Sequence, residues 1–153
     1  MQALSRPVAR DIVREKLKTC LVVPNATRWN SFFNSVDKLR DSLEKAPEDV
    51  VAQVFQAFGV VPFTDNQQAF LVEYCTVMEP LARALDILQG DKNLYIGYLL
   101  PTLVSLRNRL QSLKPGLKHA GPLVEALLTG IDHRIHGYSE RYDLILASAP
   151  YPN

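Results

Sequence analysis

Apolar residues recur every three or four positions along most of this 153-residue chain, and this spacing constrains the fold more than any other feature. Such stripes are typical of helices that bury one face against neighbouring elements. No turn dipeptide flanked by alternating apolar residues predicts a β-hairpin. The sequence therefore predicts an all-α fold, a bundle-like core of four to five main helices.

Breaking and capping residues divide the stripes into segments. Gly59 is typical of a helix stop, and Thr64 with Gln67 matches a capping box. Pro80 interrupts the longest stripe and predicts a kink near residues 76–79. The predicted helices cover residues 8–17, 28–44, 48–59, 64–90, 95–113 and 123–138. The predicted core includes Leu71, Leu81, Leu85, Leu103 and Leu127.

Composition favours a single soluble domain over residues 1–153, with a leading helix and linker in residues 1–23. A net charge of +1 gives no global basic excess, so any nucleic-acid contact requires a local patch. Basic residues on the first predicted helix either form such a patch or are a solvated face. Two cysteines, Cys20 and Cys75, are too few for a disulfide framework and favour an intracellular protein. No apolar run is long enough to span a membrane.

No catalytic or metal-binding pattern stands out. His133 and His136 lie three apart on a predicted helix, but a metal would need further converging ligands. Carboxylates are scattered, and nothing indicates the convergence that a two-metal nuclease requires. Cys75 lies in an apolar stripe and fits a small core residue better than a nucleophile. The sequence predicts no catalytic residue, no metal site and no cofactor in this chain.

One pair of residues is suited to a planar, anionic partner. Trp29, the only tryptophan, follows Arg28 at a predicted helix start with Thr27 as its N-cap. An indole can stack on an unpaired base, and a guanidinium can hold a phosphate through two hydrogen bonds. The alternative is that Trp29 anchors the helix in the core while Arg28 lies on the surface.

Several segments in order resemble one protein family. Thr27-Arg-Trp-Asn-Ser31 resembles the T-R-W-N-S element of hAT-superfamily transposases. The stretch from Tyr74 to Gly90, which contains Glu79-Pro80-Leu81, resembles a later segment of that family. The segments that begin at Leu99 and Leu123 resemble the helices that follow it. The resemblance covers residues 24–149, and it implies the helical insertion domain of an RNase H-like transposase.

The resemblance also implies a function. Trp29 would stack on a flipped base beside a cleaved end, Arg28 would support that geometry, and Thr27 and Asn30 would complete the DNA contact. The family's catalytic carboxylates, its divalent metal and its BED-type zinc finger have no counterpart here, so we expect a fragment or decayed derivative that is not an enzyme.

The expected partner is DNA at a transposon end, in the nucleus. The alternatives are a domesticated remnant for protein–protein interaction, with a protein partner or homo-oligomer, and an independent metal-dependent nuclease.

Overall fold

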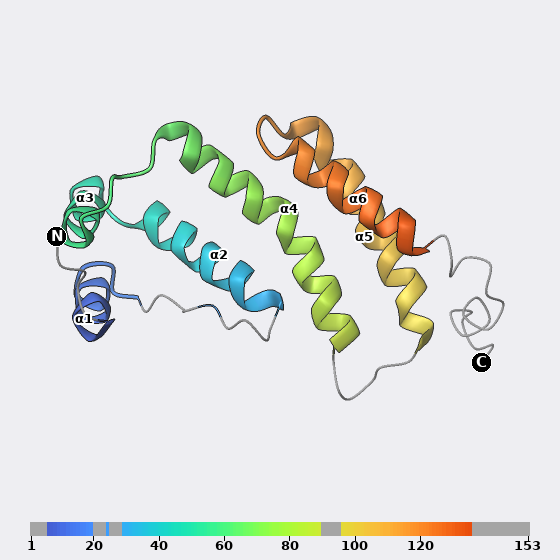
Figure 1. The fold of residues 1–153 in the computed structure, drawn as a ribbon, viewed down its shortest axis with the longest axis horizontal. Coiled ribbons are helices and arrows are strands. Elements are labelled where there is room, and N and C mark those ends of the chain that lie inside the picture. Colours follow the sequence, from blue (N-terminus) through green and yellow to red (C-terminus); the bar gives the residue numbers. More distant parts are fainter. Residues whose placement is uncertain (1–5, 20–23, 25–28, 90–95, 136–153) are drawn as a thin grey trace. The chain divides into compact units, whose positions relative to one another are not determined.

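The computed structural model describes residues 6–19, 24, 29–89 and 96–135, and within them every regular element is helical (Figure 1). The all-α prediction is confirmed. These residues form six α-helices, one in each of the six predicted segments; α1 and α3, with 11 residues each, are the shortest, and the other four are the main helices. In chain order the elements are α1 (Arg6–Lys16), α2 (Trp29–Lys45), α3 (Glu48–Phe58), α4 (Asp65–Gln89), the 3-10 turn η1 (Ile96–Tyr98), α5 (Leu99–Leu113), the 3-10 turn η2 (Lys114–Gly116) and α6 (Gly121–Ile135).

The chain divides into two compact units, Met1–Cys75 and Thr76–Asn153, and the boundary falls inside α4. The first unit contains α1, α2, α3 and the start of α4. The second contains the rest of α4 with α5 and α6. The expectation of one domain over residues 1–153 stays a prediction.

Helix α1 packs against α3 in the first unit (Figure 1). Val13 of α1 and Val54 of α3 are both buried, each on the apolar side of its helix. The ammonium group of Lys16 donates a hydrogen bond to Gln53 Oε1 on α3 at 2.9 Å. The two buried valines and this hydrogen bond thus define the face of α1 that packs against α3. The opposite face of α1 is turned away from α3.

The turn between α3 and α4 follows the predicted signals. Gly59 has φ 64°, a left-handed conformation, and its N–H donates to the carbonyl of Gln56. The N–H of Val60 donates to Phe55 O at 3.0 Å, which completes the two bonds of a Schellman motif. Thr64 then caps α4, since its N–H donates to Gln67 Oε1 at 2.9 Å and its hydroxyl accepts from the Gln67 N–H at 3.4 Å.

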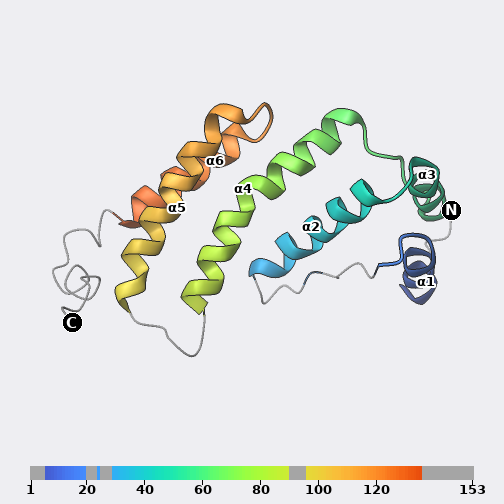
Figure 2. The same cartoon turned by 180° about the vertical axis from the view of Figure 1, so that it is seen from behind.

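Helices α4, α5 and α6 supply the core of the second unit. α5 and α6 lie side by side in both views (Figures 1 and 2). The most deeply buried side chains are Val77, Leu110 and Val124, one from each helix. The remaining buried members of the cluster are Ala84, Leu106 and Ala120.

The predicted core leucines need a correction. Leu71, Leu81, Leu85, Leu103 and Leu127 are all partly buried, and none belongs to the fully enclosed cluster. Leu81 and Leu127 pack against the cluster from its edge. On α5 the enclosed leucines are Leu106 and Leu110 instead of Leu103.

Four prolines of the described residues lie within α-helices, and the first of them, Pro7, is the second residue of α1. α4 runs as one helix through Pro80, so the predicted kink did not divide it into two elements; its bend stays a prediction. Pro101 is the third residue of α5, which begins at Leu99 after η1, and Pro122 is the second residue of α6. Proline is tolerated in a first turn because those N–H groups have no partner within the helix.

Candidate functional site

The start of α2 is the candidate site that the sequence predicted. The helix was expected from about residue 28, and the structure begins it at Trp29, with Asn30 in the second position and half-buried. Thr27 and Arg28 lie outside the described residues, as does the Trp29 side chain, so the predicted cap, the phosphate contact and the ring orientation stay predictions.

An exposed aromatic side chain lies one turn beyond Trp29. Positions 29, 32 and 33 share a face, because residues three or four apart are neighbours on a helix. Phe32 is 56% exposed, whereas Phe33 is half-buried. Both phenylalanines fit the three-to-four spacing of the apolar stripe on this helix, yet Phe32 is exposed to solvent. The first turn of α2 thus contains both the backbone position of Trp29 and the accessible ring of Phe32.

The first turn of α2 contains no acidic residue. The N-terminal end of a helix carries a partial positive charge from its unpaired backbone N–H groups. The earliest carboxylate on the helix is Asp37, two turns later. Local electrostatics at this end therefore favour an anion over a cation.

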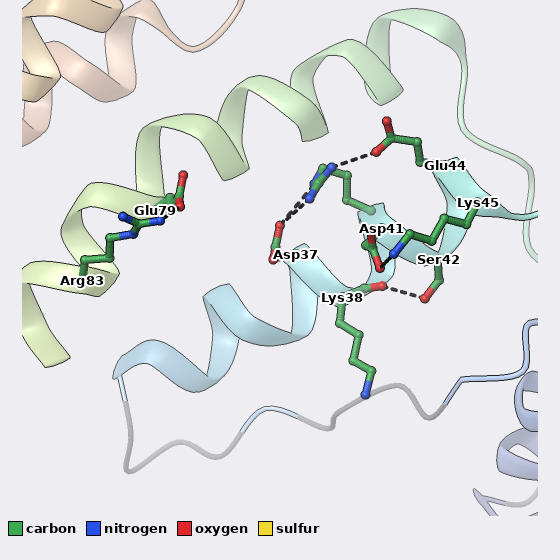
Figure 3. A network of polar contacts seen from close by, with 9 residues as sticks. Asp37, Lys38, Asp41, Ser42, Glu44, Lys45, Glu79 and Arg83 are labelled. Atoms are coloured by element: carbon green, nitrogen blue, oxygen red, sulfur yellow. Dashed lines mark hydrogen bonds and ion pairs between the residues drawn. The ribbon is translucent and has the colours of Figure 1, made fainter.

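The later turns of α2 hold charges that pair with each other (Figure 3). Arg40 donates to Asp37 Oδ1 through Nε at 3.1 Å and Nη2 at 2.9 Å, and to Glu44 Oε2 through Nη1 at 2.9 Å. The hydrogen bond that Arg40 donates to Asp37 is the main reason why the pKa of Arg40 is raised. Lys45 pairs with Asp41 at 2.8 Å. These cations already have carboxylate partners on their own helix, so they are poor candidates for phosphate contacts.

Cys75 is the buried thiol of the first unit. It is 5% exposed, and burial is the largest cause that raises its pKa, followed by the negative charge of Asp37. A thiol with a raised pKa remains protonated at neutral pH and is a poor nucleophile. The prediction that Cys75 is a small core residue is confirmed.

Other sites considered from the sequence find little support in the part of the chain that the structure describes. No three histidine, cysteine or acidic side chains come together there to hold a metal ion. His133 is exposed in the last turn of α6, while His136 lies outside the described residues.

None of the described helices is both long and apolar enough to cross a membrane.

The connection between α3 and α4 exposes an apolar patch that the apolar spacing did not predict. Phe58, Val60 and Val61 are 37%, 57% and 82% exposed. Phe63, by contrast, turns inward and meets Phe55 edge-on, with ring centroids 5.4 Å apart. The available signal was the pair of valines directly after the helix stop at Gly59, where a solvated turn normally carries polar residues.

Comparison with known proteins finds no relative of this chain. No family model, curated protein or solved structure matches the chain.

Proposed function

We propose that this chain is a DNA-contacting helical domain of the hAT transposase type, without nuclease activity of its own. In this proposal Trp29 stacks on a base flipped out beside a cleaved DNA end. Arg28 holds a neighbouring phosphate, and Thr27 and Asn30 position the start of the helix. The protein would act in the nucleus, where its partner is a transposon end.

The observation that carries the proposal is the accessible aromatic residue in the first turn of α2. Phe32 is 56% exposed, one turn after the position of Trp29 and on the same face. Exposed aromatic rings at adjacent positions are a usual platform for unpaired bases, each stacked base contributing about 1–3 kcal/mol. The absence of a carboxylate from the first turn supports the same reading, because phosphate groups would meet no repulsion there.

The test is binding to two DNA duplexes that differ only by one unpaired base. Trp29→Ala should weaken binding to the duplex with the unpaired base by roughly 5- to 150-fold, the equivalent of losing one stacked base. Binding to the fully paired duplex should change little. The matched control is Phe70→Ala, which removes an aromatic side chain that is 46% exposed on α4.

Stability separates base stacking from core packing. If Trp29 is a surface platform, Trp29→Ala should leave the thermal midpoint almost unchanged. If it is a core anchor, the same change should cost about 3–5 kcal/mol. A strongly destabilised variant that still binds DNA like the wild type while folded would refute the stacking role.

A second function, protein–protein interaction by a domesticated remnant, is favoured by the apolar patch of Phe58, Val60 and Val61. A Val60→Ser/Val61→Ser variant tests it by sedimentation at increasing protein concentration. Self-association of the wild type that this variant loses would support the second function. Equal, concentration-independent sedimentation of both proteins would count against the patch as a homo-oligomer interface.

A further inference from the structure

Positive charge is concentrated at the N-terminal end of the chain. Residues 6–19 contain five basic and two acidic side chains, a net of three positive charges in a chain whose total is +1. The rest of the chain is therefore slightly acidic. Such asymmetry between segments, more than overall charge, indicates a nucleic-acid contact.

The packing of α1 determines which of these cations face solvent. Val13 is buried on the side of α3, and Lys16 is held by Gln53 of that helix. Arg14 and Lys18 are exposed, and among the described residues neither forms an ion pair. Arg40 differs from both, because its guanidinium forms ion pairs with two carboxylates.

Backbone geometry places two of the basic positions on one face of α1. Arg10 and Arg14 are four residues apart on α1, so their Cβ atoms lie about 5–6 Å apart on one face. Lys18 follows the end of the helix, where a left-handed φ of 49° turns the chain. Arg10 thus lies near the middle of α1, Arg14 in its C-terminal half and Lys18 just beyond its end. Arg14 and Lys18 are exposed and form no ion pair among the described residues.

We propose that Arg14 and Lys18, together with Arg10, contact the phosphate backbone of DNA. This inference rests on the proposed DNA-contacting role and assigns it a second surface, one that recognises phosphates irrespective of base sequence. Arginine binds phosphate through paired hydrogen bonds and lysine binds it as a point charge. Contacts of this kind position a protein on DNA and supply most of its non-specific affinity.

The fold favours DNA over the other polyanion that a basic helix can bind, an anionic membrane. A helix that lies on a membrane inserts an apolar face between the lipids. In α1 the apolar side carries Val13, which is 4% exposed and turned toward α3. The exposed side of α1 carries charged residues, Arg14 among them, together with Asp11 and Glu15. With its apolar side covered by α3, this helix suits contact with a phosphate backbone and not insertion into lipid.

The experiment measures how DNA affinity depends on salt, with an Arg14→Gln/Lys18→Gln variant and a fully paired duplex. The logarithm of the binding constant falls with the logarithm of salt concentration by about 0.9 per phosphate contact. The variant should therefore show a slope shallower than the wild type by roughly 1–2, and lower affinity at low salt. An Arg109→Gln/Arg134→Gln variant removes the same charge from two exposed positions of the second unit and should retain the wild-type slope.

The outcomes distinguish this inference from the proposed function. If the α1 variant keeps the wild-type slope, or both variants change it equally, the α1 contact is refuted, whatever Trp29→Ala does. If the slope changes as expected but Trp29→Ala keeps its preference for an unpaired base, only base stacking fails. A wild-type chain that binds no DNA at low salt, or binds only vesicles of anionic lipid, overturns both. An α1 variant that loses stability with unchanged DNA affinity shows that these cations only stabilise the end of the helix, and also refutes the contact.

Discussion

Replacing Leu110 by alanine should destabilise the second unit more than any neighbouring change on α5. The side chain is 0% exposed and belongs to the core cluster formed with Val77 and Val124. Removing three buried carbon atoms loses about 0.8 kcal/mol for each, or about 2.4 kcal/mol. The cavity that remains adds to this loss, so we expect a total of about 3–5 kcal/mol.

Urea unfolding followed by circular dichroism at 222 nm measures the effect. Val104→Ala is the control, because Val104 is 50% exposed on the same helix and its truncation should change stability by no more than about 0.5 kcal/mol. The fluorescence of Trp29 adds a reporter in the first unit. Coincident transitions by both signals would support one cooperative domain, and separate transitions would indicate two. A Leu110→Ala variant as stable as Val104→Ala would refute the assignment of the core.

Three further predictions concern the turn, the buried thiol and catalysis. Gly59→Ala should cost about 1–2 kcal/mol, since φ is 64° there, whereas Gly116→Ala, which meets open space, should be nearly neutral in the same thermal unfolding experiment. Burial raises the pKa of the Cys75 thiol in the folded state. The stability that the protonated thiol contributes is therefore complete below the pKa of the unfolded thiol, and it is lost as pH rises through the pKa of the folded thiol. Unfolding midpoints measured from pH 7 to pH 10 should therefore fall more for the wild type than for Cys75→Ala; parallel curves would contradict this. The purified chain should not cleave DNA with magnesium or manganese, and cleavage that survives repurification but is lost on mutation of an acidic residue would refute that expectation.

Local signals in the sequence predicted most of the secondary structure. The helix stop at Gly59 and the cap at Thr64 were both identified correctly, because each depends on backbone bonds made within a few residues. The apolar spacing likewise located every described helix to within a few residues. Such features need no knowledge of distant contacts.

Depth of burial was predicted less well, because it depends on which helices meet. A stripe of apolar residues defines a face about 100° wide, but not which residue lies on the line of closest approach. Val77 and Val124 are fully buried, whereas Leu103 is only partly buried. Phe32 fits the periodicity of its stripe, yet it is exposed. The spacing of apolar residues does not show how far a partner helix extends along the stripe. Local chemistry does not determine the role of Trp29, and the proposed role rests on the resemblance to a protein family.

The most direct test of the central claim uses Trp29 as its own probe. It is the only tryptophan, so intrinsic fluorescence excited at the indole band reports on this residue alone. Titration at low salt with a duplex that carries one unpaired base should quench this emission strongly, because the indole stacks on the base. A fully paired duplex, bound to the same saturation, should quench it much less. Unchanged emission at full saturation with the unpaired-base duplex, while anisotropy shows that DNA is bound, would contradict the account.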